Sequence, residues 1–300
     1  MGFVGLGKMG GAMIGRLHAG GHSVVGFDLS PDARHRAAAA GVAVASSLDD
    51  LCAAMETPCL VWLMTPPGEA TESAVAALAD RLRSGDILVD GGNSDFRDSL
   101  RRGRALGPRG IVYVDVGVSG GVQGARTGCG LLVGATSEIY AHIAPVLLTL
   151  AAPGACVRVG TMGAGHLAKA VHNGVEYALM QAYGEGYEIL SASDLDVDVI
   201  ATLSAWQAGC SVRSYLLEKL IQALAPDPTL AAVAGRAADS GMGRWTLEEA
   251  VRLGVPAPTI AAALQARLRS QQSDSPTMKS IAALRGVIGG HPVPKSDGGE

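Results

Sequence analysis

The stretch that decides the fold lies at the start of the chain, where Gly2-Phe3-Val4 runs into Gly5-Leu6-Gly7-Lys8-Met9-Gly10. The last six residues fit the pattern G-x-G-x-x-G, between a short apolar strand and a helix that we expect from about Lys8 to Ala19. Glycines at these positions permit a tight turn and let backbone N–H groups at a helix N-terminus approach a pyrophosphate. The chain has 41 glycines, so the motif alone fits a plain glycine-rich turn equally well.

The sequence that follows favours the functional interpretation. A second predicted strand, Ser23 to Phe27, is followed directly by Asp28. A carboxylate there can accept both ribose hydroxyls of a dinucleotide and repels a 2′-phosphate, which favours NAD over NADP. Arg34 and Arg36 lie a few residues downstream and could reach a 2′-phosphate, so use of NADP stays open.

Short apolar runs continue to alternate with helical stretches through the first half of the chain. The further predicted strands are Cys59 to Met64, Ile87 to Asp90, Ile111 to Asp115, Gly130 to Val133 and Val157 to Val159, the last two of which could pair antiparallel. From Met162 onward the segments become long and alanine-rich with helical spacing. The pattern predicts an α/β protein, with a Rossmann-like doubly wound sheet over residues 1–160, an all-α domain over 161–291, and a flexible tail over 292–300.

Composition excludes several classes of function. With 24 Lys+Arg against 28 Asp+Glu among 300 residues and no basic block, the chain lacks the charge pattern of a nucleic-acid or membrane-surface binder. Mean hydropathy is +0.26, but the longest apolar stretch, Ile143 to Val157, contains two prolines and is too short for a membrane span. The five cysteines are scattered and form no C-x-x-C pair, which indicates reduced thiols in a cytoplasmic protein. No cluster has the spacing of metal ligands, so we assign no metal.

The candidate catalytic residues lie in one helical segment of the second half. They are Lys169, His172, Asn173, Glu176 and Tyr177, at positions i, i+3, i+4, i+7 and i+8. This spacing places all five on one helical face, with alanine and valine between them. An ordinary solvent-facing helix would show the same spacing, but its polar face would consist mainly of repeated Glu, Lys, Arg and Gln. The residue types here favour acid/base chemistry.

Three further segments complete a resemblance to a known family. The chain contains Val118-Ser119-Gly120-Gly121-Val122, Gly91-Gly92-Asn93-Ser94 and Gly243-Arg244-Trp245-Thr246. With the glycine fingerprint and Lys-x-x-His-Asn-x-x-Glu-Tyr, it resembles the short form of the decarboxylating 6-phosphogluconate dehydrogenases, within the β-hydroxyacid dehydrogenase superfamily. The resemblance runs from Gly2 to His291. It implies a gluconate-utilising or pentose phosphate oxidoreductase that converts 6-phosphogluconate to ribulose 5-phosphate and CO2 with reduction of NAD.

The resemblance also implies roles for individual residues. Lys169 would be the general base at the C3 hydroxyl, Glu176 the acid that protonates the enediol, and Asn173 a further catalytic group. Substrate carboxylate and hydroxyls would be oriented by Asn93, Ser119, Gly120, Gly121, His172, Asn173 and Tyr177. The cofactor would contact Gly5, Gly7, Lys8, Met9, Gly10, Asp28, Leu29, Ser30, Met64 and Asn93.

The substrate phosphate would need fixed cations, and arginine suits it through its bidentate fork. By family position these contacts fall to Arg244, Thr246 and Arg267, although spacing does not separate Arg267 from Arg269. Arg285 and His291 resemble residues that a neighbouring subunit's tail contributes, which implies a homodimer or homotetramer. Gly128-Cys129-Gly130 departs from the familiar long-form sequence and has no functional interpretation.

Two other functions remain open at this point. The chain could oxidise a small 3-hydroxy acid such as 3-hydroxyisobutyrate, although several cations would then be left without an anion. It could also be a noncatalytic dinucleotide sensor, although a sensor needs neither a base nor an acid on one helical face.

Overall fold

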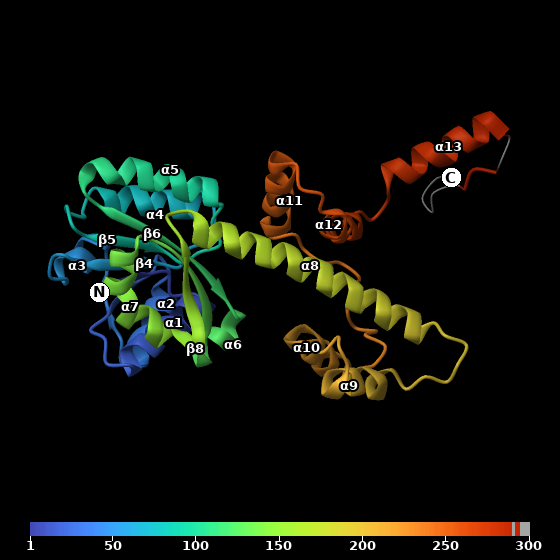
Figure 1. The fold of residues 1–300 in the computed structure, drawn as a ribbon, viewed down its shortest axis with the longest axis horizontal. Helices are drawn as coiled ribbons and strands as arrows, with labels where there is room; N and C mark the ends of the chain where they lie inside the picture. Colours follow the sequence, from blue (N-terminus) through green and yellow to red (C-terminus); the bar gives the residue numbers. More distant parts are fainter. Residues whose placement is uncertain (290–291, 295–300) are drawn as a thin grey trace. The chain divides into compact units, whose positions relative to one another are not determined.

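The computed structural model describes residues 1–289 and 292–294. They form two compact units, one of Met1–Val175 with Met242–Leu253, the other of Glu176–Gly241 with the segment from Gly254 onward. The helices and strands of both units are labelled in Figure 1.

The first unit is built on an eight-stranded sheet with the order β3-β2-β1-β4-β5-β6-β7-β8. Its strands are β1 (Gly2–Val4), β2 (Val25–Phe27), β3 (Ala43–Val44), β4 (Leu60–Leu63), β5 (Ile87–Asp90), β6 (Val112–Ser119), β7 (Cys129–Gly134) and β8 (Ala151–Gly160). The first six are parallel, and β7 pairs antiparallel with β6 and parallel with β8. The order reverses beside β1, which places a topological switch point between β1 and β4, where ligands of such sheets bind.

Helices cover both faces of this sheet (Figure 1). They are α1 (Lys8–Ala19), α2 (Pro31–Ala39), α3 (Leu48–Ala53), α4 (Glu69–Ala79), α5 (Phe96–Leu106), the 3-10 turn η1 (Gly107–Arg109), α6 (Gly121–Thr127) and α7 (Ser137–Leu150). Met13 of α1 and Leu147 of α7 belong to one buried cluster, and Leu51 of α3 and Leu78 of α4 belong to another. Because neighbouring strand residues point to opposite faces, Phe3 joins the first cluster and Val4 the second. The predicted doubly wound α/β fold is confirmed.

The predicted strands differ from the observed ones at the sheet edges and at β6, which runs on to Ser119 beyond the predicted end at Asp115. Both late strands run antiparallel to β1–β6, as the sequence suggests, but β8 covers Ala151–Gly160 rather than Val157 to Val159. Pro153 lies within it, which an edge strand tolerates because one side of its backbone has no ladder partner. The two residues of β3 were not predicted.

The second half of the chain is helical, as predicted. It contains α8 (Ala164–Ser191), α9 (Val199–Gly209), α10 (Tyr215–Leu224), α11 (Met242–Leu253), α12 (Pro258–Ser270) and α13 (Pro276–Gly289). In the second unit, Leu203, Leu217 and Leu224 form a small buried core, against which Trp206 and Tyr187 pack. Over the described residues, no helix combines the length and the apolar character needed to cross a membrane.

Candidate active site

The three glycines of the fingerprint differ in what surrounds them. Gly5 has φ +96° and lies so close to the carbonyl oxygen of Met64 that a side chain could not fit. A Cβ on Gly10 would overlap the carbonyl oxygen of Gly5, so this glycine lets α1 pack onto the end of β1. Gly7, the N-cap of α1, has open space in the Cβ direction. Gly5 and Gly10 are therefore required by backbone packing. Of these three glycines, only Gly7 leaves space in which a ligand could bind.

We expect Gly7→Ala to weaken dinucleotide binding without harming the fold. Gly7 has φ −63°, which alanine adopts readily, and apart from its own neighbours in the chain no protein atom lies within 4 Å of the new Cβ. The methyl group would occupy the space that a pyrophosphate needs, so the Kd for NADH should rise about ten-fold or more. Fluorescence titration with NADH measures the affinity, and Gly15→Ala, also in open space on α1, is the control. Equal NADH affinity in both variants would contradict the assignment.

Asp28 holds the turn between the first two strands. Its Oδ2 accepts from the N–H of Leu6 at 2.6 Å, and its Oδ1 accepts from the N–H of Ser30 at 2.8 Å. Arg34 Nη1 donates to the carbonyl oxygens of Asp28 and Leu29, at 2.6 and 3.3 Å, so this guanidinium is occupied by backbone. The predicted acidic residue thus stands beside the fingerprint, while Leu29 and Ser30 are exposed next to it.

Lys169 is placed by close contact between α8 and the sheet. A Cβ on Gly117 of β6 would lie 2.5 Å from Lys169 Cβ, and a Cβ on Gly165 would lie 2.5 Å from the carbonyl oxygen of Leu132. These glycines let the backbone of α8 approach β6 and β7 at van der Waals distance. As a result the Lys169 side chain is only 6 % exposed, in the same unit as the fingerprint.

The start of α8 is held by a buried carboxylate that sequence reasoning missed. Asp115 of β6 accepts from the N–H of Gly163 at 2.6 Å and from the N–H of His166 at 2.7 Å, which satisfies two orphan donors of the helix. Burial raises the pKa of the Asp115 carboxyl. His166 Nδ1 bonds Ser99 Oγ of α5 at 2.7 Å, and α8 is therefore fixed to the sheet and to α5 one turn before Lys169.

Burial along α8 differs from that of an ordinary solvent-facing helix at part of its polar face. Lys169 and Tyr177 are buried, Asn173 and Glu176 are half-buried and His172 is exposed, whereas the apolar Val171, Val175 and Leu179 are more than 40 % exposed. His172 Nδ1 lies 2.9 Å from Asn173 Oδ1, so these two predicted site residues meet. The burial of Lys169 and Tyr177 supports the functional interpretation of this face. Glu176 and Tyr177 follow on the same helix, within the second unit.

The other predicted residues of the first unit lie at strand ends or on α11. Asn93 is exposed just after β5, Ser119 ends β6, and Gly120 and Gly121 follow with φ +117° and +58°. Arg244 of α11 is exposed. Thr246 is buried, and its hydroxyl bonds the carbonyl oxygen of Ala170 at 2.6 Å, so it ties α11 to α8; its predicted role at a phosphate stays a prediction.

The segment Gly128-Cys129-Gly130 has a structural explanation. Gly128 has φ +131°, and a Cβ there would lie 2.7 Å from Cα of Ala152. Cys129 is fully buried. The segment therefore lets β7 start close against β8.

Two predicted residues meet in the second unit. The Arg267 guanidinium carbon lies 3.5 Å from the centroid of the Tyr177 ring, and the Tyr177 hydroxyl lies 3.1 Å from Asp239 Oδ1 and from Ser240 Oγ. Arg269 instead is exposed and bonds the carbonyl oxygen of Gln272. This arrangement favours Arg267 over Arg269 as the partner of Tyr177.

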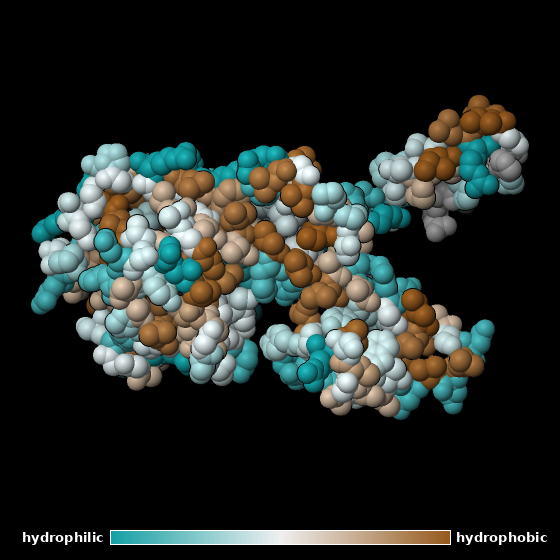
Figure 2. All heavy atoms as spheres, viewed as in Figure 1, coloured by the Kyte–Doolittle hydropathy of each residue, from teal (hydrophilic) through white to brown (hydrophobic). Residues whose placement is uncertain are grey.

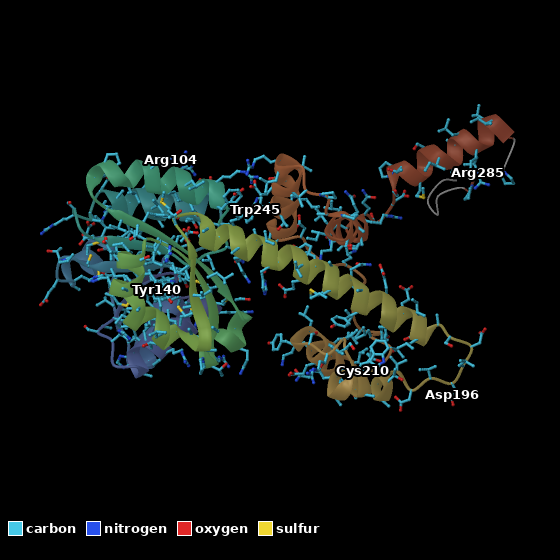
Figure 3. All side chains as sticks on the ribbon, viewed as in Figure 1. Arg104, Tyr140, Asp196, Cys210, Trp245 and Arg285 are labelled. Atoms are coloured by element: carbon cyan, nitrogen blue, oxygen red, sulfur yellow. The ribbon has the colours of Figure 1, made fainter. Side chains whose placement is uncertain are left out.

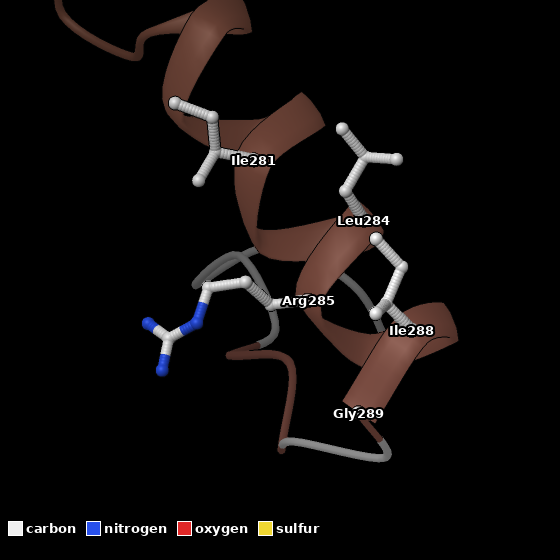
Figure 4. Close-up of a pocket in the computed structure, with 5 residues that line it drawn as sticks. All are labelled: Ile281, Leu284, Arg285, Ile288 and Gly289. Atoms are coloured by element: carbon white, nitrogen blue, oxygen red, sulfur yellow. The ribbon is translucent and has the colours of Figure 1, made fainter.

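Arg285 lies on α13, whose described side chains include none that is buried. Figure 3 labels its guanidinium on that helix, and Figure 4 shows it beside Ile281, Leu284 and Ile288, which line a shallow pocket. His291 and most of the predicted tail lie outside the described residues. Among the residues that are described, no group of three or more His, Cys, Asp or Glu side chains could hold a metal ion.

Comparison with known proteins agrees with this geometry. Residues 1–163 match the model described as the NAD binding domain of 6-phosphogluconate dehydrogenase, and residues 165–287 match that of its C-terminal domain. An NAD(+)-dependent, decarboxylating 6-phosphogluconate dehydrogenase of Haloferax volcanii is 39 % identical over 299 residues, 99 % of each chain. This chain belongs to the 6-phosphogluconate dehydrogenase family.

Solved structures of two dehydrogenases with different named substrates share the fold of this chain. Plasmodium falciparum 6-phosphogluconate dehydrogenase has a TM-score of 0.82 at 27 % identity and covers 100 % of this chain, which spans 67 % of that one. Mycobacterium tuberculosis 3-hydroxyisobutyrate dehydrogenase has a TM-score of 0.72 at 26 % identity, with 95 % and 98 % of the two chains covered. The fold is thus shared with a dehydrogenase whose name gives an unphosphorylated substrate.

Asp115 and His166 had recognisable sequence signals. Asp115 closes the predicted strand Ile111 to Asp115, and His166 precedes Lys169 by three residues. Together these two signals could have suggested that a strand carboxylate caps the glycine-rich start of a helix. Asp115 and His166 are 51 residues apart, so no local pattern in the sequence connects them.

Proposed function

We propose that this family member oxidises and decarboxylates 6-phospho-D-gluconate to D-ribulose 5-phosphate and CO2, with NAD as the hydride acceptor. The observation that carries the proposal is the place of Lys169, a buried lysine whose Cβ packs against Gly117 of β6 in the unit that contains the fingerprint. Asn173 and Glu176 follow it along α8. The 39 % identity to a protein named for this reaction supports the same assignment.

The dinucleotide site fits the cofactor by its own geometry. Gly7 leaves the N-terminus of α1 open to a pyrophosphate. Asp28 lies beside the fingerprint, where its carboxylate could accept hydrogen bonds from ribose hydroxyls. NAD, when bound, would supply the acceptor for the hydrogen on C3 of the substrate. The remaining steps are the loss of CO2 and proton transfers that side chains of this chain can perform.

In the proposed mechanism, neutral Lys169 takes the C3 hydroxyl proton as C3 is oxidised to a ketone. The bond between C1 and C2 then breaks, CO2 leaves, and its electron pair forms an enolate whose oxygen regains the proton from Lys169. Glu176 protonates the former C2 while Lys169 removes the hydroxyl proton of the enediol, which gives the ketone product. Glu176 ends ionised and Lys169 protonated, and a proton exchanged with solvent restores both.

Substrate recognition in the proposal is divided between the two ends of the sugar acid. The carboxylate and hydroxyls would be oriented by Asn93, Ser119, Gly120, Gly121, His172, Asn173 and Tyr177. The phosphate would be bound by Arg244, Thr246, Arg267, Arg285 and His291. The stacking of Arg267 on Tyr177 supports a place for both in one substrate site.

The proposal includes a homo-oligomer, a homodimer or a homotetramer, in a cytoplasmic setting. On α13, Leu284, Val287 and Ile288 are more than half exposed, and Figure 2 shows apolar side chains on this helix. An apolar helix face of this kind supports burial against a second copy of the chain. All five cysteines are free thiols, with Cys210 (Figure 3) exposed, which supports a reducing compartment.

We expect Asp28→Asn to reduce the preference for NAD over NADP. The single amide oxygen can accept from only one of the two N–H groups that the carboxylate holds, those of Leu6 and Ser30, but the side chain no longer repels a 2′-phosphate. The ratio of kcat/KM for NAD to that for NADP should therefore fall about ten-fold. Asp32→Asn, an exposed position in the first turn of α2, is the control for lost charge. An unchanged ratio in Asp28→Asn would assign the preference to another residue.

The proposed function is tested by following NADH formation at 340 nm with 6-phosphogluconate, together with CO2 release, and by repeating the assay with NADP and with 3-hydroxyisobutyrate. Both signals with 6-phosphogluconate, stronger with NAD, support it. Turnover of the unphosphorylated acid without CO2 would assign the chain to the simple hydroxyacid dehydrogenases. NADH binding without any turnover would revive the sensor interpretation.

A further inference from the structure

A buried charged cluster lies beneath the turn that carries Asn93. Asp90, the last residue of β5, is 0 % exposed, and Arg102 of α5 is 2 % exposed. Arg102 Nη1 donates to Asp90 Oδ2 at 2.9 Å. A buried ion pair is weak evidence for stability, because an apolar pair of similar volume often serves as well. The cluster therefore calls for another explanation.

The bonds of the cluster converge on the residues either side of Asn93. Asp90 Oδ1 accepts from the N–H of Gly92 at 3.0 Å, and Asp90 Oδ2 accepts from Ser94 Oγ at 2.7 Å. Ser94 Oγ in turn accepts from Arg102 Nη1 at 3.0 Å. Gly92 and Ser94 are buried while Asn93 between them is exposed. The turn is thus pinned at both neighbours, and only the Asn93 side chain is presented to the outside.

The guanidinium of Arg102 also bonds α4, the helix that follows the neighbouring strand β4. Arg102 Nε and Nη2 donate to Glu72 Oε1 of α4 at 3.0 and 2.7 Å. A Cβ on Gly92 would lie 2.8 Å from the carbonyl oxygen of Thr65, which follows β4. The same guanidinium therefore joins α4, whose preceding turn contacts Gly92, to the turn after β5. Both turns lie at the carboxyl edge of the sheet, beside the switch point.

Asp90 also accepts a hydrogen bond from outside the turn. Tyr113 of β6 donates from its hydroxyl to Asp90 Oδ2 at 2.8 Å, from the strand that pairs with β5. Ser94 alone contributes a side chain from the turn to both Asp90 and Arg102. Removal of its hydroxyl would release the turn on the Ser94 side and leave the Gly92 N–H bond and the ion pair in place.

We propose that Asp90, Arg102 and Ser94 are positioning residues, which hold Asn93 in the geometry that cofactor and substrate require. This inference rests on the proposed function, in which Asn93 orients the substrate, and on the family resemblance, which implies that Asn93 also contacts the cofactor. Preorganisation of this kind matters because a displacement of about 1 Å at a reacting group can reduce turnover by about 10²-fold.

The test is Ser94→Ala, compared with Ser47→Ala as a matched control. Ser47 caps α3 by accepting from the N–H of Asp50 at 3.0 Å, so its loss affects stability at a place without a predicted site residue. For Ser94→Ala we expect kcat/KM for 6-phosphogluconate to fall about ten-fold or more, the Kd for NADH to rise, and amide hydrogen exchange of residues 91–95 to speed up. For Ser47→Ala we expect kcat/KM and the Kd for NADH to stay at the wild-type values.

The readouts separate this inference from the proposed function. If the wild-type chain does not turn over 6-phosphogluconate, the proposed function fails, while NADH affinity and hydrogen exchange still decide the role of Ser94. Unchanged NADH affinity and unchanged exchange of residues 91–95 in Ser94→Ala would overturn the inference. Arg102→Met, checked for folding by circular dichroism, should change the same two readouts further in the same direction.

Discussion

Replacing Lys169 by methionine is expected to lower kcat for 6-phosphogluconate by about 10²- to 10⁴-fold, with NADH affinity close to that of the wild-type chain. Methionine retains most of the apolar stem that packs against Gly117, and therefore α8 should keep its place on β6. What disappears is the amine that accepts the C3 hydroxyl proton and returns it to the enolate. Steady-state kinetics and NADH titration on the same preparation measure the two quantities.

The control for this substitution is Lys219→Met. Lys219 lies on α10 in the second unit, where its amine pairs with Glu218 and Gln222 near the surface. Loss of that charge should leave kcat unchanged. If Lys169→Met kept a kcat comparable to that of Lys219→Met, Lys169 could not be the base, and the reaction would need another proton acceptor.

Gly10→Ala should produce the second large effect, a fall of about 3 kcal/mol in the free energy of unfolding. The new Cβ would overlap the carbonyl oxygen of Gly5. A Cβ is fixed rigidly to its own backbone and the carbonyl oxygen is a backbone atom, so neither atom can rotate away. The start of α1 must then move off β1. NADH affinity should fall as well, since the same helix N-terminus faces the pyrophosphate. Urea unfolding followed by circular dichroism measures the stability.

Gly15→Ala supplies the contrast on the same helix. No atom lies within 4 Å of its new Cβ, and alanine is the better helix former, so stability should rise by about 0.5–1 kcal/mol. The opposite signs of the two changes test the packing argument directly. Wild-type stability in Gly10→Ala would mean that α1 does not approach Gly5 as closely as the structure shows.

Local patterns predicted a large part of this molecule. The helix expected from Lys8 to Ala19 and the strands at Gly2 to Val4 and Ile87 to Asp90 have the bounds observed for α1, β1 and β5. Each of these elements consists of a regular apolar pattern that begins or ends next to a glycine or an aspartate, so the signal lies within a few residues. The stripe on α8 was predictable for the same reason, because a period of 3.6 residues places its members on one face.

Elements that depend on their neighbours were not predictable. The two exposed residues of β3 form a strand only because Val25 and Gly26 of β2 pair with them. Residues 137–150 form α7 although Pro145 lies inside it, and β8 extends through Pro153 at an open sheet edge. Neither proline marks the boundary that its presence suggests.

The amino-acid sequence by itself determined the doubly wound fold, the dinucleotide turn and which side chains line one face of α8, because all of these arise from residues close together in the chain. Tertiary structure decided which groups hold them in place. Asp115 meets the start of α8 across 48 and 51 residues, and Arg102 meets Glu72 across 30. Such pairs form because strand pairing and helix packing bring together elements that are far apart in the chain, and no local period records that meeting.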